Sequence, residues 1–446
     1  MKLKKTRKMK KGISIFKIVV AVAIILAPVL IHAQDLSGDT KLTCDKSWSV
    51  SPTSTLKIET YDSDTKFSTW EKSEVRIMGE LVVTGISKED FQTLSNAFAK
   101  LMDGSNGNSI DTKLIESSKS LFGTKTKLEL YDGSNISVGK IKITYKLWMP
   151  ASMSLDLSSK YNNVSIASLN GNVSLDLYDC DVEMGDYSTG TFQMKYSKIS
   201  IGNGGNTSFD VYDSKVRAQN VKNLKIESKY SNYTIASALD VRVNSYDDDF
   251  DFKNLKTIEA KASYSLFILD GQIGNSIFDI YDTDVKGGSY STLAYSAKYS
   301  ELVAKRIESL SIKAIYDCTL RVDEINDFIC DESKYDEVYF GTVGNSFVMP
   351  DTYDVQIKIN KLLPSFTKFD GDFKYGTIRL AADPLLNYKL SYDGTYGSID
   401  YPKEKFSQSP LVHIEKDSKV QFEGSTSQNP KCTIKFKSYD VKFSIE

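Results

Sequence analysis

The sequence predicts an all-β protein, and within that class a single-stranded parallel β-solenoid, from three observations. Tyrosines recur about every 17 residues over much of the chain, apolar and polar residues alternate within each repeat, and 26 Tyr and 21 Phe stand against 3 Trp and 9 Pro. A unit of this length is too short for two helices, whereas it holds two or three short strands with their turns. Such coils stack at about 4.8 Å and pair their backbones with the coils on either side.

Residues 1–33 have the pattern of a secretory signal peptide. A basic stretch precedes a 14-residue apolar run at 18–31, and cleavage is expected between Ala33 and Gln34. The run is shorter than the roughly 20 residues that cross a bilayer, and Pro28 interrupts it, so a retained anchor is the weaker alternative. We therefore expect an exported protein, periplasmic, at the cell surface or secreted, with no integral membrane segment after cleavage.

Cleavage would leave a clearly acidic chain. The net charge of the whole sequence is −2, and the first 33 residues carry eight positive charges and no acidic residue, so the mature charge is about −10. An acidic chain binds nucleic acid poorly and is repelled by anionic membrane surfaces. We therefore expect no nucleic-acid partner, and an envelope protein or a glycan remains open as the partner.

Residues 34–150 are expected to form a β-rich N-terminal region that contains one amphipathic helix at about 87–103. Ser87 can cap this helix, and Gly104 is placed to end it. The apolar residues of the segment share one face, which predicts that the helix covers one side of a small sheet.

Residues 151–400 are predicted to form the solenoid repeats. One tyrosine marks each repeat, at intervals of 16 to 19 residues. These tyrosines are Tyr161, Tyr178, Tyr196, Tyr212, Tyr230, Tyr246, Tyr264, Tyr281, Tyr299, Tyr316, Tyr335 and Tyr353. The intervals then lengthen to 22 residues at Tyr375 and 21 at Tyr396. Because an open solenoid end is an exposed edge, we expect residues 401–446 to form capping strands.

Successive repeats differ in their chemistry. One set has the form Lys229-Tyr230-Ser231, whereas the other has Tyr followed by Asp, so the true repeat is about 34 residues. Identical coils would stack aspartates about 4.8 Å apart, and like charges directly opposite one another are destabilising. We predict a surface strip in which Lys and Asp alternate around a row of tyrosines. On this hypothesis Asp in place of Ser231 or Asn162 would lower the melting temperature.

The direction in which the tyrosines point stays open at this stage. In the Lys-Tyr-Ser set the tyrosine lies an even number of residues from the inward apolar residues, so simple alternation would point it inward. In the Tyr-Asp set it directly follows an inward residue, so alternation would point it outward. Exposure of the Tyr-Asp pairs would favour a binding module, and burial would favour a purely structural protein. The candidate binding residues are Tyr178, Asp179, Tyr212, Asp213, Tyr246, Asp247, Tyr281, Asp282, Tyr316 and Asp317.

Side chains suited to catalysis or metal binding are sparse. His413 is the one histidine beyond the signal segment, and no nucleophile elbow lies near it. The cysteines are Cys44, Cys180, Cys318, Cys330 and Cys432. They have neither the density of a disulfide framework nor zinc-site spacing, so isolated buried thiols are favoured. Asp247-Asp248-Asp249 with Asp251 is favoured as a solvated turn over a weak calcium site. We expect no enzymatic activity, cofactor or metal.

A polysaccharide-active enzyme of the β-helix type, lyase-like or hydrolase-like, is the alternative. Its site would need long loops that hold two carboxylates at a defined separation. The repeats between 154 and 353 vary too little in length to supply such loops. Room for them exists at residues 360–430, which include Asp370, Asp372, Asp383 and Asp400.

The order of these segments resembles a known family. A strand-like segment around Trp70 is followed by the capped helix, by TYKLWMPASMSLDLSSKYNNVSIASLNGNVSL, and then by recurrent KYSxxxI coils. This order is similar to that of the putative-adhesin (DUF4097-type) β-solenoid proteins of the Bacteroidetes envelope, over nearly the whole mature chain. The family's usual Tyr-Gly coil is kept at Tyr375-Gly376 and Tyr396-Gly397, and the coil that begins at Tyr161-Asn162 matches its shape with Asn where Gly is usual. The resemblance implies a β-solenoid in the cell envelope with an adhesin-like or scaffold role.

Overall fold

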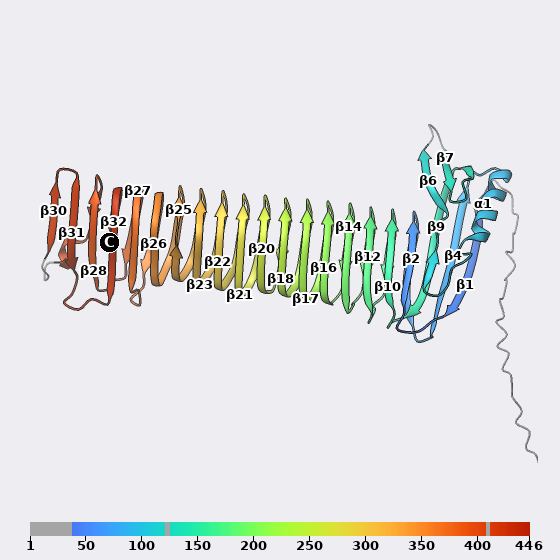
Figure 1. Cartoon of the computed structure of the whole chain (residues 1–446), viewed down its shortest axis with the longest axis horizontal. Helices are drawn as coiled ribbons and strands as arrows, with labels where there is room; N and C mark the ends of the chain where they lie inside the picture. The colour runs from blue at the N-terminus through green and yellow to red at the C-terminus, as the bar shows by residue number, and fades with distance from the viewer. Residues whose placement is uncertain (1–37, 121–124, 407–410) are drawn as a thin grey trace, which may run out of the picture.

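The computed structural model describes residues 38–120, 125–406 and 411–446. Over these ranges the chain forms one elongated parallel β-solenoid with a broader N-terminal end (Figure 1), and the predicted fold class is confirmed. The expected signal segment and its cleavage position, between Ala33 and Gln34, lie outside the described residues. No helix in the described ranges has the length and apolar character that crossing a bilayer requires.

Each coil contains two strand segments that are joined by a tight turn. In one coil these are β10 (Ser154–Lys160) and β11 (Asn163–Ile166), and in the next they are β12 (Asn172–Tyr178) and β13 (Asp181–Met184). β10 pairs in parallel with β12, and β11 pairs in parallel with β13. The solenoid therefore has two parallel sheets. We call the outer surface of the β10–β12 sheet face A and that of the β11–β13 sheet face B.

The same pattern continues along the chain, and many of the later segments join around the second edge into long bent strands. The strands that follow, both short and long, are β14 (Thr189–Lys195), β15 (Lys198–Ile201), β16 (Gly204–Tyr212), β17 (Lys215–Lys229), β18 (Asn232–Tyr246), β19 (Asp249–Phe252), β20 (Leu255–Ser263), β21 (Leu266–Tyr281), β22 (Asp284–Lys298), β23 (Glu301–Tyr316), β24 (Thr319–Cys330), β25 (Ser333–Lys334), β26 (Glu337–Leu362) and β27 (Lys368–Ala382).

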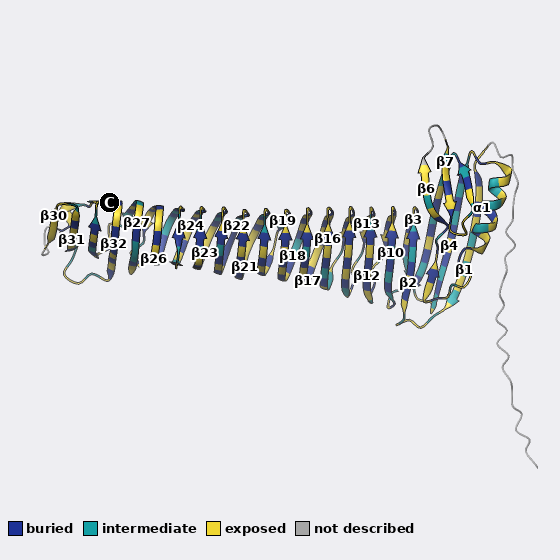
Figure 2. Ribbon diagram, turned by 45° about the horizontal axis from the view of Figure 1, so that its top comes forward, coloured by how far each residue is buried: buried dark blue, intermediate teal, exposed yellow. Residues whose placement is uncertain are grey.

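A continuous apolar column fills the space between the two sheets. Inward and outward residues alternate along the strands, as in the burial pattern of β12 (Figure 2), because successive side chains of a strand point to opposite sides. Phe250 stacks on Phe267 with ring centroids 4.7 Å apart, close to the spacing of neighbouring strands. Burial of each such side chain stabilises the fold by about 1.5–3 kcal/mol, so neighbouring coils stabilise one another.

The column of coils begins earlier in the sequence than residue 151. β2 (Thr55–Tyr61) pairs in parallel with β10, and β3 (Asp64–Trp70) pairs in parallel with β11. These two strands form a complete coil with a Tyr61-Asp62 turn. About eighty residues of chain separate this coil from the one that stacks on it, which hides it from a search for a constant sequence interval.

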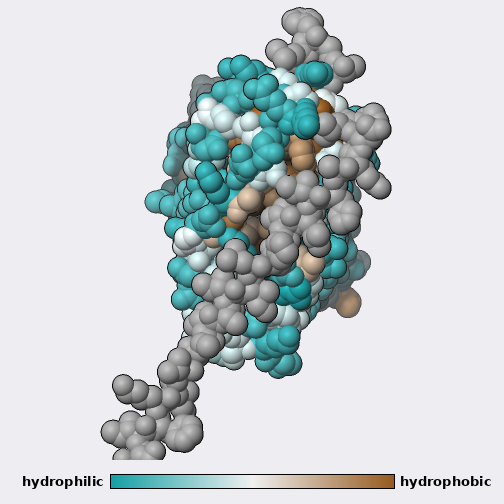
Figure 3. All heavy atoms as spheres, turned by 90° about the vertical axis from the view of Figure 1, so that its right-hand side faces the viewer, coloured by the Kyte–Doolittle hydropathy of each residue, from teal (hydrophilic) through white to brown (hydrophobic). Residues whose placement is uncertain are grey.

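The N-terminal end is closed by antiparallel strands and a helix. β1 (Thr40–Ser49), β4 (Glu74–Thr84) and β9 (Lys140–Pro150) extend the sheet of face B beyond β3. The remaining elements at this end are α1 (Lys88–Lys100), β5 (Ser109–Asp111), β6 (Ile115–Ser120), β7 (Thr126–Leu130) and β8 (Asn135–Val138). Viewed from this end, the visible surface is mostly hydrophilic, with a strip of apolar residues near its middle (Figure 3). A polar end of this kind protects the terminal coil from edge-to-edge association.

The helix begins where the sequence predicts. The Ser87 side chain accepts a hydrogen bond from the Asp90 amide at 3.0 Å, and Leu94 and Phe98 are buried against the N-terminal strands. The helix ends at Lys100, three residues before the expected position.

The C-terminal end departs from sequence order. β32 (Cys432–Ile445) lies between β27 on one side and the coil of β28 (Tyr388–Thr395) and β29 (Ser398–Asp400) on the other. A short 3-10 helix (Lys403–Phe406) follows that coil. β31 (Lys419–Ser425) and β30 (Val412–Lys416) then cover it in antiparallel fashion. Of the expected capping strands, β30 and β31 therefore lie at the tip, whereas β32 is an internal coil.

Candidate binding surface: the tyrosine ladder

The turn between the two strand segments of each coil contains one residue in the left-handed backbone region. In the Lys-Tyr coils this residue is the tyrosine, for example Tyr196 with φ 54°, and in the Tyr-Asp coils it is the aspartate, for example Asp213 with φ 46°. The left-handed tyrosines are Tyr161, Tyr196, Tyr230, Tyr264, Tyr299, Tyr335, Tyr375 and Tyr396, and the left-handed aspartates at these turns are Asp62, Asp179, Asp213, Asp247, Asp282, Asp317, Asp354 and Asp440. The left-handed residue interrupts the alternation of inward and outward side chains at the turn. The tyrosines of both kinds of coil can therefore point outward at the same edge.

The strand register places the two kinds of coil in a checkerboard. Lys195 lies opposite Tyr178 on one side and Tyr212 on the other. One position later, the left-handed residues alternate between Tyr and Asp. At both positions, adjacent coils therefore carry different side chains and never the same charge. This is the alternation of Lys and Asp around the tyrosines that the sequence predicts. Like charges at one position are separated by two coils, or about 9.6 Å.

All tyrosines at this edge form one continuous row of rings, which we call the tyrosine ladder. In spatial order it consists of Tyr61, Tyr161, Tyr178, Tyr196, Tyr212, Tyr230, Tyr246, Tyr264, Tyr281, Tyr299, Tyr316, Tyr335, Tyr353, Tyr375, Tyr439 and Tyr396. Neighbouring ring centroids are 5.1 to 5.7 Å apart, with interplanar angles of 66° to 81°. This is the edge-to-face geometry that aromatic pairs prefer.

The candidate binding residues predicted from the Tyr-Asp coils all lie on this edge, but they make up only part of the ladder. Tyr212, Tyr246 and Tyr281 are 37–40% exposed, and Tyr178 and Tyr316 are half-buried. The five aspartates are exposed beside them. Most tyrosines of the Lys-Tyr coils, which the sequence-based set leaves out, are more exposed, with Tyr230 at 45%.

Charges of both signs flank the ladder. The lysines at the strand ends are Lys160, Lys195, Lys229, Lys298, Lys334 and Lys374, and the aspartates are the eight in the left-handed turns. Partial desolvation in the row, together with the adjacent tyrosines and the aspartate of the next coil, raises the pKa of Tyr196, Tyr230 and Tyr264 above the ordinary value. Like an unshifted tyrosine, each of these phenols is neutral at physiological pH and can donate as well as accept a hydrogen bond.

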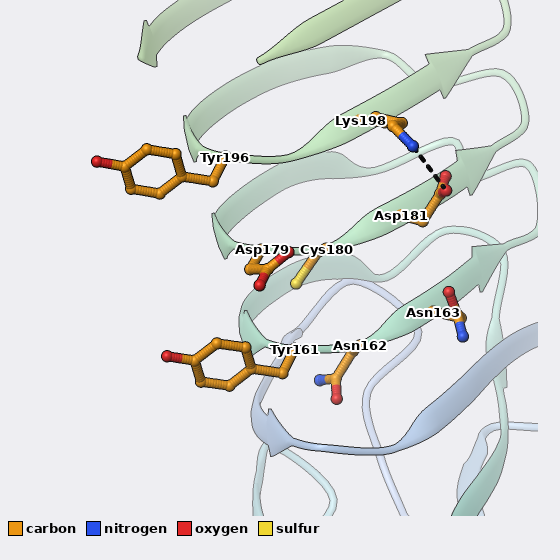
Figure 4. Close-up of a pocket in the computed structure, with 8 residues that line it drawn as sticks. All are labelled: Tyr161, Asn162, Asn163, Asp179, Cys180, Asp181, Tyr196 and Lys198. Atoms are coloured by element: carbon orange, nitrogen blue, oxygen red, sulfur yellow. Dashed lines mark ion pairs between the residues drawn. The ribbon is translucent and has the colours of Figure 1, made fainter. Parts of the chain in front are cut away.

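A shallow notch lies beside the ladder where two tyrosines of the Lys-Tyr type flank an aspartate. Tyr161 and Tyr196 project in the same direction from coils two apart, and Asp179 lies between them (Figure 4). The notch has a volume of about 300 Å³, and Asp181 and Lys198 line its other side, 4.0 Å apart. The notch thus combines aromatic edges, carboxylates and an ammonium group.

The residue after each turn belongs to the interior, which corrects one prediction. Ser231 is buried, its Oγ accepts a hydrogen bond from the Ser214 amide at 3.1 Å, and it donates to the Lys229 carbonyl at 2.9 Å. Asn162 is likewise buried and accepts from the Ser63 amide at 2.6 Å. Placing Ser231 and Asn162 in the charged surface strip was therefore wrong, because the left-handed turn directs the following side chain inward.

The buried residues after the turns form a polar column that runs beneath the ladder. Its members are Ser63, Asn162, Cys180, Ser197, Ser214, Ser231, Asp248, Ser265, Thr283, Ser300, Cys318 and Asp336. In most coils the side chain accepts a hydrogen bond from the corresponding backbone amide of an adjacent coil. A buried amide without an acceptor would be costly, so this column maintains the turns that carry the tyrosines.

The aspartate run at 247–249 does not form a cluster. Asp248 points into the polar column and is 2% exposed, so the prediction of a wholly solvated turn is wrong for this residue. Asp247 and Asp249 face solvent, and Asp251 forms an ion pair with Lys253 at 2.8 Å. In the part of the chain that the structure describes, no group of three or more His, Cys, Asp or Glu side chains has an arrangement suited to a metal ion.

The other residues of chemical interest lie apart from one another. Asp383 forms an ion pair with Lys361 at 2.9 Å, and Asp370 with Lys368 at 3.0 Å. His413, in the terminal hairpin, contacts Tyr401 and Glu415. All five cysteines are free thiols, and four of them are buried. The prediction of isolated buried thiols therefore holds for these four, while Cys44 is partly exposed.

Comparisons with known proteins add little to this description. No family model matches the chain, and no curated protein matches it. Among solved structures, it is similar to a "putative cell adhesion protein" from Clostridium sporogenes, with 6% sequence identity, 91% of this chain and 100% of that chain covered, and a TM-score of 0.14. A TM-score this low carries no argument about either fold or function.

Proposed function

We propose that this protein is an exported, non-catalytic β-solenoid of the cell envelope, with an adhesin-like or scaffold role, and that the tyrosine ladder is its binding surface. Membership of the DUF4097-type family and a periplasmic, surface or secreted location are parts of the same proposal. It is supported by the signal-like N-terminal sequence and by the order of segments that resembles that family.

The observation that carries the proposal is the use of tyrosine in the left-handed turns. For a bulky residue this conformation is unfavourable by roughly 1–2 kcal/mol, whereas Gly, Asn and Asp adopt it more readily. The two edge-to-face contacts of each ring contribute about 0.5–1.5 kcal/mol apiece, so they roughly offset the backbone term. Stability alone therefore gives little reason for a tyrosine such as Tyr230, and unfavourable backbone geometry is often retained where a side chain is needed for function.

Exposure of the rings supports binding over a purely structural role. Tyrosine combines a rigid apolar ring with a polar tip and loses little side-chain entropy in a contact. A straight row of such rings offers a repeated set of weak contacts to a long partner. Together these contacts can give high avidity when the partner is also repetitive.

A polysaccharide-active enzyme is the second candidate. The observation in favour of an enzyme is that residues 360–430 contain the longer connections and several carboxylates. Asp370 and Asp383 each pair with a lysine, whereas glycoside hydrolysis uses two carboxyl groups that face one another across a substrate. Release of reducing ends from polysaccharides would favour the enzyme.

Binding is tested with the purified mature chain and two variants that have the same number of substitutions. One variant carries Tyr196→Asn, Tyr230→Asn and Tyr264→Asn, because asparagine fits the left-handed turn. The matched control carries Ile268→Asn, Ile277→Asn and Ile329→Asn, which alter exposed apolar residues on the sheet faces. Both are expected to fold, as checked by circular dichroism.

The readout is retention on immobilised envelope fractions and on a glycan array. We expect the native chain and the control to bind, and the ladder variant to bind much more weakly. Equal binding by all three proteins would refute the ladder as the binding surface.

A further inference from the structure

The alternation of coils gives the ladder a lattice period of two coils. Tyr161 and Tyr196 occupy equivalent left-handed positions two coils apart, and Tyr230 repeats them after two more. At the usual strand spacing, equivalent rings therefore recur about every 9.6 Å. A partner that uses every equivalent site must be extended and must repeat at a similar distance.

The balance of charges limits the chemistry of that partner. Six lysines and eight aspartates flank the ladder, and they are interleaved along its length. A polyanion would meet the aspartates and a polycation would meet the lysines, and each would suffer repulsion at every second coil. The alternating pattern therefore favours a neutral polymer that offers many hydrogen-bonding groups.

The notch adds a local reason for a sugar. Beside the ladder it offers the edges of the Tyr161 and Tyr196 rings, the acceptors Asp179 and Asp181 and the donor Lys198, in about 300 Å³ (Figure 4). The Tyr178 ring fills the space between those two rings. A pyranose unit presents apolar C–H faces to aromatic rings and hydroxyls to charged groups. The phenols of the ladder are neutral at physiological pH and supply further donors.

We propose that the tyrosine ladder binds a neutral, extended β-1,4-linked polysaccharide along its length, because such a chain repeats every two sugar units at a distance close to that of two coils. The exposed ring edges contact the apolar faces of the sugars, and the flanking Asp and Lys side chains form hydrogen bonds with their hydroxyls. This inference rests on the proposed binding function, and it commits that function to one class of partner.

Oligosaccharides of increasing length test whether the repeat of the ligand matches the two-coil period of the ladder. The mature chain is titrated with cello-oligosaccharides and chito-oligosaccharides of increasing length, and its retention on insoluble cellulose and chitin is measured. Amylose serves as the control, because its α-linked chain coils and lacks an extended period. We expect the Kd to fall with each added disaccharide, and amylose to bind much more weakly.

The two triple variants test the surface. Loss of three rings should raise the Kd for the longest oligosaccharides about tenfold or more, since a tenfold change is about 1.4 kcal/mol, or about 0.5 kcal/mol for each ring. The control with Ile268→Asn, Ile277→Asn and Ile329→Asn should bind like the native chain. Binding of cellulose and chitin that the ladder variant leaves unchanged would overturn the inference.

Failure of this inference differs from failure of the proposed function. If the native chain binds neither cellulose nor chitin, yet the ladder variant loses retention on envelope fractions, the ladder binds a different partner and the glycan inference is wrong. Equal affinity for amylose and cello-oligosaccharides would refute the claim that the ladder recognises a disaccharide repeat equal to its two-coil period.

Discussion

Substitution of Asp336 by asparagine should stabilise this protein at neutral pH. Asp336 is 1% exposed in the polar column, where its carboxylate accepts hydrogen bonds from the Cys318 amide at 2.7 Å and from Ser333 Oγ at 2.6 Å. Desolvation outweighs these bonds and raises the pKa of Asp336 from 3.8 to about 6. The protein therefore carries a buried ionised carboxylate at pH 7.

The shift of the pKa gives the size and sign of the effect. A difference of roughly two pKa units corresponds to about 3 kcal/mol. Because the folded state holds the proton more tightly than the unfolded chain, the contribution of Asp336 to the unfolding free energy falls as the pH rises from about 4 to about 6. Asp336→Asn should therefore match the native protein below pH 4 and exceed its stability by up to about 3 kcal/mol at pH 7.

The fold already contains the precedent for this change. Asn162 occupies the equivalent position, its Oδ1 accepts from the Ser63 amide, and its Nδ2 donates to Ser159 Oγ at 2.5 Å. Ser159 precedes Asn162 by three residues, as Ser333 precedes Asp336. An asparagine side chain therefore fits the column without steric change.

The assay is thermal unfolding between pH 3.5 and 7.5, combined with amide hydrogen exchange across residues 318–336, because repeat proteins open locally. The exposed Asp317→Asn variant is the control for the loss of a charge. If the difference in stability between Asp336→Asn and the native protein is the same at pH 4 and pH 7, the reasoning about this carboxyl group is wrong.

Three further predictions concern the elements that maintain the ladder. Ser231→Ala should lower the unfolding free energy by about 1–3 kcal/mol, measured by urea denaturation, because the buried Ser214 amide loses its acceptor. Gly376→Ala should lower the melting temperature strongly, since φ is +114° and the new Cβ would meet the Val355 carbonyl oxygen. Deletion of β32 should cause aggregation, visible in light scattering, because it leaves strand edges unpaired on both sides.

Each of these predictions has a control or a contrary outcome. Ser200→Ala alters an exposed serine on face B and should change little. Gly133→Ala places a Cβ at a similarly positive φ but in open space, so it separates backbone strain from the steric clash. A chain without β32 that stays monomeric and melts at an unchanged temperature would contradict the proposed insertion of this strand.

Two features of the sequence indicate further coils that belong to the ladder. Tyr61-Asp62 and Tyr439-Asp440 have the form of the Tyr-Asp coils, but irregular sequence intervals separate them from their neighbours in space. Tyr375 and Tyr396 are both in left-handed turns, and no other tyrosine of the ladder lies between them in the sequence. Strict alternation requires a Tyr-Asp coil between them, and β32 supplies it through Tyr439.

The sequence by itself determined the repeat length, the parallel stacking of coils, the capped helix and the alternation of two coil types. These properties follow from local periodicity and from the chemistry of adjacent residues, which the chain displays in order. Only the tertiary structure decided that all ladder tyrosines share one edge, since a single left-handed residue reverses the parity on which a sequence argument depends. It also decided the burial of Ser231 and Asp336 and the position of β32, because contacts across coils do not depend on distance along the chain.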